Sequence, residues 1–268
     1  MPSSWLQLEG MACVVTGGTG GIGRAIVSTL ADAGARVAIL DRDEATVREF
    51  AGQVGRDAIG LACDIASEPS VLAARDAVAR AFGRCDVLVN NAAVLTPRPL
   101  LDATLEEWNR NLAVNLTGYF LCSRVFGAQM IQTGGGAIVH LGSIATELPQ
   151  PNGLDYSACK AAIQALSRQI AVEWGDRGVR SNVVNPGPVV TPMTAKLNAD
   201  PDIVVRRAAM TAIKRLGTPE DIANIVAFLA SPRSGYVTGA DLMATGGLHV
   251  MMMKHMPQPG WTPAQDAN

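Results

Sequence analysis

The chain has 268 residues, a net charge of −2, and a composition that is 48% hydrophobic, 17% charged and 4% aromatic. No cluster of lysine and arginine stands out, which argues against nucleic acid or an acidic membrane surface as a partner. The first ten residues have neither a basic start nor an apolar core, and no apolar run approaches the roughly 18 residues of a membrane span. We therefore expect no signal peptide and no membrane partner, and the length favours one large domain.

The five cysteines form no C-x-x-C pair, and no Cys/His cluster has metal-ligand spacing. An odd number of cysteines without a framework favours a reducing compartment, so we expect a cytoplasmic protein without a metal site. Cys159 could be a nucleophile, but a cysteine nucleophile needs an activating base, and no histidine lies nearby in sequence.

Apolar segments of strand length alternate with helical segments from one end of the chain to the other. Strands are predicted at 11–16, 36–40, 57–62, 86–89, 136–142, 179–185 and 240–244. Helices are predicted at about 22–33, 43–54, 68–82 and 104–132, then from Tyr156 to about 175, and again from Thr218. This alternation predicts an α/β fold, with a single doubly wound parallel sheet of about seven strands and helices on both faces. We place this domain at 1–247 and expect a Met-rich tail at 248–268.

The first predicted strand runs into a glycine-rich turn, Thr16-Gly17-Gly18-Thr19-Gly20-Gly21-Ile22-Gly23. Glycines at this point let the backbone turn tightly and approach a pyrophosphate, whose charge then meets the N-terminus of the next helix. The turn lacks the Gly-Lys-Ser/Thr ending of a nucleotide-hydrolysing loop. It therefore predicts a dinucleotide site.

Asp41 ends the second predicted strand and bears on the choice of dinucleotide. A carboxylate there can accept hydrogen bonds from the 2′-hydroxyl of the adenosine ribose and would repel a 2′-phosphate, which favours NAD over NADP. Arg42 follows directly. Because an arginine nearby can accept the phosphate, NADP stays open.

Tyr156 and Lys160 lie four residues apart at the start of a predicted helix. Four residues is one helical turn, so both side chains leave the same face. A positive charge beside a phenol favours the phenolate, which makes the pair a candidate acid/base device. The spacing alone is also common in helices.

The motifs together resemble the short-chain dehydrogenase/reductase family over nearly the whole chain. They are, in chain order, TGGTGGIG (16–23), Asp41, Asp64, NNAA (90–93), Asn115 in VNLTGYF, Ser143 in HLGSIA, YSACK (156–160), NPGPVVT (185–191), RLGTPEDIANIVAFLAS and YVTGA. The resemblance implies a Rossmann-like fold that binds NAD(P) and moves a hydride between nicotinamide and an alcohol or carbonyl.

The resemblance also implies roles for single residues. Tyr156 would be the general acid/base, Lys160 would lower its pKa and hold the nicotinamide ribose, and Ser143 would hydrogen-bond the substrate oxygen. Asn115 would help to hold a water that links Lys160 to solvent. The cofactor-binding set would be Gly17, Thr19, Gly20, Gly21 and Ile22 at the phosphates, Asp41 and Arg42 at the adenosine ribose, Asp64 and Ile65 at the adenine, Asn91 and Ala92 beside that ribose, and Val189 and Thr191 at the carboxamide, with Tyr156 and Lys160. A homotetramer would be the assembly, through the helices at 104–132 and 154–175.

Three positions depart from the family's usual sequence. Ala93 stands where glycine is usual, Thr245 where an aspartate is usual, and His140 where an asparagine is common. We expect Ala93 to be tolerated beside the cofactor and His140 to be a satisfied core residue rather than a catalyst.

Substrate identity is expected to depend on the loops 94–100, 145–155 and 192–212. Glu147, Gln150 and Asn152 could bind hydroxyl groups of a sugar or polyol, and Arg206 and Arg207 could meet an anionic substrate or only solvent. Our main hypothesis is an NAD-dependent oxidoreductase of small to medium polar alcohols, with sugars, polyols or hydroxy acids favoured. The alternatives are an NADPH-dependent ketoreductase, such as a 3-oxoacyl thioester reductase, and a non-catalytic nucleotide-binding regulator.

Overall fold

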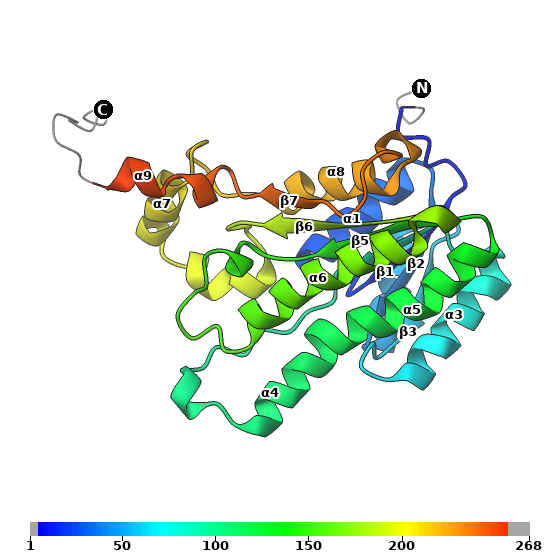
Figure 1. The fold of residues 1–268 in the computed structure, drawn as a ribbon, viewed down its shortest axis with the longest axis horizontal. Coiled ribbons are helices and arrows are strands. Elements are labelled where there is room, and N and C mark those ends of the chain that lie inside the picture. The colour runs from blue at the N-terminus through cyan, green and yellow to red at the C-terminus, as the bar shows by residue number, and fades with distance from the viewer. Residues whose placement is uncertain (1–4, 257–268) are drawn as a thin grey trace.

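A computed structural model describes residues 5–256 of the chain. Its centre is a seven-stranded sheet in which every neighbouring pair is parallel, in the order β3-β2-β1-β4-β5-β6-β7 (Figure 1). This confirms the predicted doubly wound α/β fold. The strands are β1 (Ala12–Thr16), β2 (Arg36–Asp41), β3 (Ile59–Ala62), β4 (Val87–Asn90), β5 (Gly136–Leu141), β6 (Val179–Pro186) and β7 (Asp241–Ala244).

Helices cover both faces of this sheet, as the crossover connections of a parallel sheet require. They are α1 (Gly21–Asp32), α2 (Glu44–Val54), α3 (Glu68–Phe82), α4 (Leu105–Leu112), α5 (Gly118–Gln132), α6 (Tyr156–Trp174), α7 (Pro201–Met210), α8 (Pro219–Ala230) and α9 (Met252–His255). Helices α1, α2 and α8 pack on one face, and α3, α5 and α6 pack on the other (Figure 1).

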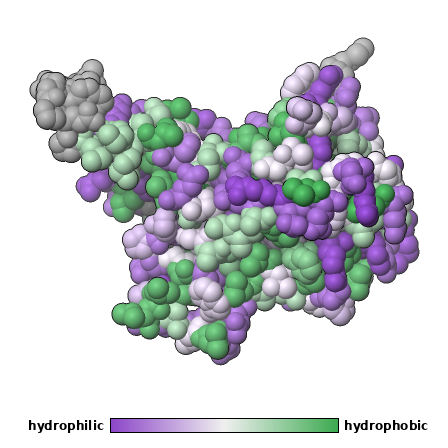
Figure 2. All heavy atoms as spheres, in the orientation of Figure 1, coloured by the Kyte–Doolittle hydropathy of each residue, from purple (hydrophilic) through white to green (hydrophobic). Residues whose placement is uncertain are grey.

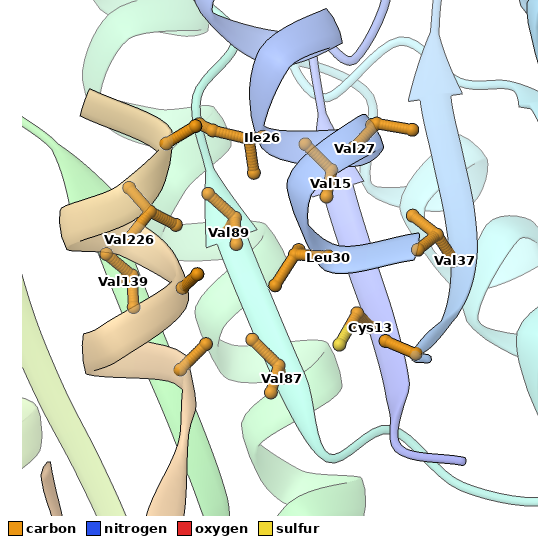
Figure 3. Packing of buried hydrophobic residues seen from close by; sticks show 14 of the residues in the cluster. Cys13, Val15, Ile26, Val27, Leu30, Val37, Val87, Val89, Val139 and Val226 are labelled. Carbon is orange, nitrogen blue, oxygen red and sulfur yellow. The ribbon is translucent and has the colours of Figure 1, made fainter. Parts of the chain in front are cut away.

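The hydrophobic core forms two clusters, one on each face of the sheet, because successive side chains of a strand point to opposite faces. All of β1 is buried, with Cys13 and Val15 directed to one cluster and Ala12 and Val14 to the other. Figure 3 shows the first cluster, where Leu30 of α1 and Val226 of α8 meet the valines of β1 and β4. Small aliphatic side chains let the helices lie close to the sheet, which explains the predominance of Ala and Val in the sequence.

The order of the strands reverses between β1 and β4, because β1 leads outward to β2 and β3 while β4 leads to β5, β6 and β7. In open α/β sheets, ligands bind in the crevice beyond the carboxyl ends of the strands at this point. The glycine turn follows β1 here, and Asn91 follows β4.

The helical region predicted at 104–132 begins as expected, with Thr104 and Glu107 forming a capping box. Between α4 and α5, however, residues Ala113–Thr117 form a π-helical turn. Such turns insert one residue and are frequent at functional sites. Asn115, which the sequence singled out, lies within this turn.

The loop predicted at 192–212 and the predicted tail both contain helical structure. The segment 192–212 forms a 3₁₀ helix, Pro192–Asn198, followed by α7. Beyond β7, a short 3₁₀ turn leads to α9, and Met251 between them is buried. Residues 257–268 of the predicted tail lie outside the described part of the chain. No helix within residues 5–256 is long and apolar enough to cross a bilayer.

Candidate active site

The carboxyl edge of the sheet opens into a cavity of about 670 Å³. Ser143 and every residue of the predicted cofactor-binding set, from Gly17 to Thr191, line this cavity; of the predicted site residues, Asn115 alone is not among its lining residues. The wall also includes residues that the sequence did not single out, namely Val94, Leu95, Ile144, Leu148, Met193, Thr194, Met210 and Leu248. Of the three polar loop residues predicted for substrate hydroxyls, Gln150 lines the cavity, and Glu147 and Asn152 are not among its lining residues.

The glycine turn is fixed to the end of β4. Asn91 Nδ2 donates to the carbonyl oxygens of Thr16 (3.0 Å) and Gly17 (2.9 Å), and its backbone N–H donates to Thr16 Oγ1 at 3.0 Å. Gly17 has φ +62°, and a Cβ there would lie 2.6 Å from Ala92 Cα. The turn therefore requires glycine for both its conformation and its close approach to the neighbouring loop.

Asp41 faces the glycine turn from the end of β2. Its Oδ2 accepts hydrogen bonds from Thr19 Oγ1 at 2.5 Å and from the Thr19 N–H at 3.1 Å. Arg42 follows in the cavity wall, and its own N–H donates to Asp41 Oδ1 at 2.8 Å. Asp41 and Arg42 are thus neighbours in the cavity wall, and the choice between NAD and NADP that the sequence left open remains open here.

Asp64 and Ile65 enter the cavity from the loop after β3. Asp64 Oδ1 accepts from the Ala66 N–H at 3.0 Å, which closes a local turn that precedes α3. Ile65 is buried, and its side chain would lie 2.7 Å from a Cβ at Gly118, so α5 approaches this loop closely through a glycine.

Ser143 follows the carboxyl end of β5. Its N–H donates to Asn185 Oδ1 at 3.0 Å, and its Oγ accepts from the Ala145 N–H at 3.1 Å. Asn185 comes from the NPGPVVT motif at the end of β6, so the two neighbouring strands hold Ser143 between them. Sequence pattern alone indicated no role for Asn185, although it is the first residue of the NPGPVVT motif.

Tyr156 is the first residue of α6 and is half-buried in the cavity wall. Burial raises the pKa of its phenol, and the neighbouring Ser143 hydroxyl acts in the opposite direction. Among the groups of this chain, burial is therefore the dominant effect on the pKa of Tyr156, and the lowering by Lys160 that the family resemblance implies stays a prediction.

Lys160 is 1% exposed, an unusual position for an ammonium group. Its Nζ donates to the Leu141 carbonyl oxygen at 2.7 Å and to Tyr119 Oη at 3.0 Å. It also lies 4.7 Å from the centre of the Tyr119 ring and 5.6 Å from that of Tyr156. Burial lowers the pKa of Lys160 to about 7. The sequence did not identify Tyr119, although it lies one helical turn after Asn115.

Asn115 is fully buried, and both ends of its amide bind the same residue. Its Oδ1 accepts from the Val94 N–H and its Nδ2 donates to the Val94 carbonyl oxygen, each at 2.9 Å. Val94 lines the cavity. The π-helical turn thus fixes the start of the loop 94–100.

His140 lies in β5 with no exposed surface, as expected for a core residue. Its Nδ1 is 3.2 Å from Asn90 Nδ2, and its Nε2 is 3.2 Å from Ser181 Oγ. Burial, together with the charge of Lys160, lowers the pKa of His140 to about 3. A neutral imidazole with partners on both nitrogens is structural.

Val189 and Thr191 bring the loop after β6 across the glycine turn. A Cβ at Gly21 would lie 3.0 Å from Thr191 Cβ, so this loop touches the beginning of α1. Thr191 also caps the following 3₁₀ helix in a reciprocal box with Thr194.

All five cysteines are buried as free thiols, and burial raises the pKa of Cys159 to about 12, so it is not an activated nucleophile.

The chain matches known proteins over nearly its whole length. A family model described as enoyl-(acyl carrier protein) reductase matches residues 17–249. D-threitol dehydrogenase from Mycolicibacterium smegmatis is 39% identical over 90% of this chain and 94% of its own length. Cis-4-hydroxycyclohexanecarboxylate dehydrogenase from Sinomonas cyclohexanicum is 40% identical over 87% and 94%.

Among solved structures, 3-ketoacyl-(acyl-carrier-protein) reductase from Brucella melitensis complexed with NADH has a TM-score of 0.84 and 31% identity, with 90% of this chain and 99% of that chain covered. These matches extend over nearly the whole length of the chain, and the TM-score shows a shared fold. The chain therefore belongs to the short-chain dehydrogenase/reductase family of NAD(P)-dependent oxidoreductases that act on CH–OH groups.

Proposed function

We propose that this protein is an NAD-dependent oxidoreductase that moves a hydride between nicotinamide and a secondary alcohol or ketone of a small to medium polar substrate. The observation that carries the proposal is the single cavity whose wall holds both the glycine turn with Asp41 and the group Ser143, Tyr156 and Lys160. A dinucleotide site and a proton-transferring side chain in one cavity are what hydride exchange with an alcohol requires.

The backbone of the chain fits a dinucleotide. A Cβ at Gly17 or Gly21 would meet neighbouring atoms at 2.6 and 2.8 Å, so both positions require glycine. The turn that they shape lies in the cavity wall at the start of α1, where a pyrophosphate would lie. We assign the phosphates to this turn, the adenine to Asp64 and Ile65, and the carboxamide to Val189 and Thr191. The bound nicotinamide supplies or accepts the hydride.

Asp41 supports NAD rather than NADP. Its carboxylate is held at the glycine turn by Thr19, where a 2′-phosphate would meet a negative charge. Arg42 in the same wall supports the second candidate, an NADPH-dependent ketoreductase. The similarity to a 3-ketoacyl-(acyl-carrier-protein) reductase keeps that candidate in view, although that structure is complexed with NADH.

In this proposal Tyr156 Oη takes the proton of the alcohol as the hydride leaves, and returns it in the reverse direction. Ser143 Oγ hydrogen-bonds the reacting oxygen. The ammonium of Lys160 favours the phenolate of Tyr156 and holds the nicotinamide ribose. Asn115 helps to hold a water between Lys160 and solvent, while its amide anchors Val94 in the cavity wall.

The relatives support a polar alcohol as substrate. One is named for D-threitol, a polyol, and another for cis-4-hydroxycyclohexanecarboxylate, a hydroxy acid. Polar groups in the cavity wall, such as Gln150, are suited to hydroxyl recognition. We also propose a cytoplasmic location, which the five free thiols support.

We propose a homotetramer that uses α5 and α6. Hydrophobic and weakly hydrophobic residues occupy the middle of the face in Figure 2, over these helices in the orientation of Figure 1, and Phe120 of α5 and Val172 of α6 are exposed. Light scattering of the purified chain tests this assembly, and a stable monomer would remove it.

Calorimetric titration of the cofactor-free protein with NADH and with NADPH tests the cofactor assignment without knowledge of the substrate. We expect NADH to bind more tightly, because Asp41 opposes the 2′-phosphate. Preference for NADPH would transfer the proposal to the ketoreductase. Binding of neither dinucleotide would reject the proposal that the protein is an enzyme. Oxidation of D-threitol and of cis-4-hydroxycyclohexanecarboxylate with NAD, measured by NADH absorbance, then tests the reaction.

A further inference from the structure

Helix α7 contributes one cationic side chain to the cavity. Arg207 is half-buried and lines the cavity together with Met193, Met210 and Leu248. Its neighbour Arg206 is exposed and is not among the lining residues. The two arginines that the sequence could not tell apart therefore have different positions, and only Arg207 is placed to meet a molecule in the cavity.

The guanidinium of Arg207 is held by a short series of hydrogen bonds. Its Nη1 donates to Asn198 Oδ1 at 2.5 Å, and Asn198 Nδ2 donates to Thr194 Oγ1 at 3.1 Å. Thr194 Oγ1 in turn donates to the Val189 carbonyl oxygen at 2.9 Å. This series connects α7 to the loop after β6, so the arginine is positioned relative to the cavity before any ligand arrives.

Most of the donors of Arg207 remain available. A guanidinium has five N–H groups, and the bond to Asn198 uses one of them. Within the described residues, no carboxylate forms an ion pair with Arg207, whereas Arg98 and Arg215, for example, each have one. A half-buried guanidinium in a cavity wall, without an ion-pair partner among the described residues, is suited to an anionic ligand.

The other charged residues of the cavity wall already have assignments. Asp41, Arg42 and Asp64 belong to the proposed adenosine site, and Lys160 donates to Leu141 and Tyr119. Among the described residues of the cavity wall, this leaves Arg207 as the cation that can select among substrates.

We propose that Arg207 binds a carboxylate of the substrate, so that hydroxy acids are the preferred class and neutral polyols are poorer ligands. This inference rests on the proposed function, because it assigns the substrate class of the same cavity. The planar fork of a guanidinium matches a carboxylate in two parallel hydrogen bonds, which a hydroxyl group cannot reproduce.

One other anion could reach this arginine, namely the pyrophosphate of the cofactor. The loop that holds Asn198 begins at Thr191, which lies against Gly21 of the phosphate-binding turn. The experiment therefore measures the affinity for NADH separately from the affinity for the substrate.

The experiment uses matched pairs of ligands in which a carboxylate replaces a hydroxymethyl group. The pairs are D-threonate with D-threitol, and cis-4-hydroxycyclohexanecarboxylate with cis-4-(hydroxymethyl)cyclohexanol. Each is titrated calorimetrically into the NADH-loaded full chain, as wild type, Arg207→Met, Arg207→Lys and the control Arg206→Met. Binding is measured rather than turnover, so the result does not depend on the catalytic assignment.

In wild type we expect at least one carboxylate to bind about tenfold or more tightly than its neutral partner, as for a hydrogen-bonded charge pair. Arg207→Met should bring this ratio close to one, Arg207→Lys should restore part of it, and Arg206→Met should keep it. Raising the salt concentration should weaken binding of the carboxylate and leave the neutral partner unaffected.

Three results would overturn the inference. The first is a wild-type ratio near one, or no saturable binding of either carboxylate. The second is a ratio that survives in Arg207→Met, and the third is a loss confined to NADH affinity, which would assign Arg207 to the pyrophosphate. Failure of the proposed function looks different: carboxylates would bind through Arg207 while no alcohol in the panel reduced NAD.

Discussion

Two parts of the cavity wall are built in different ways: the cofactor half, which holds the glycine turn, Asp41 and Asn91, and the substrate half, to which the loops 94–100, 145–155 and 192–212 contribute. In the cofactor half, residues at or just beyond the end of one strand bind residues at the end of a neighbouring strand, as Asn91 binds Gly17 (2.9 Å) and Thr19 binds Asp41 (2.5 Å). In the substrate half, the wall comes from loops that are distant in sequence and contact one another in space. For example, the Arg98 N–H donates to the Asn152 carbonyl oxygen at 2.9 Å. The sheet dictates the first half, and contacts between loops dictate the second.

Loss of the Tyr156 hydroxyl should give the largest difference between the two halves, because it should lower turnover and leave cofactor binding nearly unchanged. Tyr156→Phe removes the group that moves the proton and leaves the glycine turn and Asp41 in place. We expect turnover to fall by about 10²–10⁴-fold, the usual contribution of a general acid/base, with the affinity for NADH changed by no more than about threefold. NADH absorbance measures the first quantity and calorimetry the second.

Unaltered turnover in Tyr156→Phe would reject the assigned mechanism. A large loss of NADH affinity would instead show that the phenol belongs to the cofactor half of the wall. Ser157→Ala, at a half-buried position in the same helical turn and outside the residues that line the cavity, is the matched control for disturbance of α6 and should retain full turnover.

The comparison also explains what the sequence could predict. Each predicted strand overlaps an observed one, because strands buried on both faces of a parallel sheet are continuous apolar runs. The glycine turn and Asp41 were predictable because their places follow from the ends of strands. The π-helical turn at Ala113–Thr117 was not, since a single inserted residue leaves helical periodicity almost unchanged.

Contacts between distant segments were equally out of reach. Tyr119 reaches Lys160 across 41 residues of sequence, and no spacing rule connects them. Arg206 and Arg207 have the same chemistry and adjacent positions, so only the orientation of α7 distinguishes the one that lines the cavity. The sequence could name the loops that form the substrate half, but it could not predict which of their side chains face the cavity.

Gly17→Ala should damage the cofactor half directly. A left-handed conformation costs a residue with a Cβ about 1–2 kcal/mol, and the contact at 2.6 Å with the Ala92 backbone adds the 1–3 kcal/mol or so that overpacking typically costs. Gly83→Ala is the control, because Gly83 is also left-handed but a Cβ there would have nothing within 4 Å. Urea unfolding should show a larger loss for Gly17→Ala, and only this variant should lose affinity for NADH. Equal losses would mean that the close approach to Ala92 has no energetic role.

Asn111→Ala tests the substrate half. Asn111 Nδ2 donates to the buried Asp155 Oδ1 at 2.8 Å, across 44 residues of sequence, and Thr96 Oγ1 donates to Asn111 Oδ1 at 3.4 Å. Removing the amide leaves a buried carboxylate short of a donor, immediately before Tyr156, and should destabilise the fold by about 1–3 kcal/mol. We expect a raised KM for the substrate with NADH affinity retained. Asn109→Ala, exposed on the same helix, should change neither quantity; a loss of NADH affinity in Asn111→Ala would contradict the independence of the two halves.

His140 lies in β5 with no exposed surface, and its effect on folding stability should depend on pH. Its folded-state pKa of about 3 is below the ordinary value of 6.5, so the unfolded chain binds a proton in this range that the folded chain does not. This difference in proton binding costs no folding stability above pH 6.5. Below that pH the loss of folding stability grows as the pH falls towards 3, at about 1.4 kcal/mol per pH unit. His140→Asn, which can still hydrogen-bond Asn90 or Ser181, should therefore lose less stability than wild type when urea unfolding is repeated at pH 8, 6 and 5. Parallel pH profiles of unfolding free energy would mean that His140 binds a proton in the folded protein as readily as in the unfolded chain. The buried polar groups around it would then tolerate a charge.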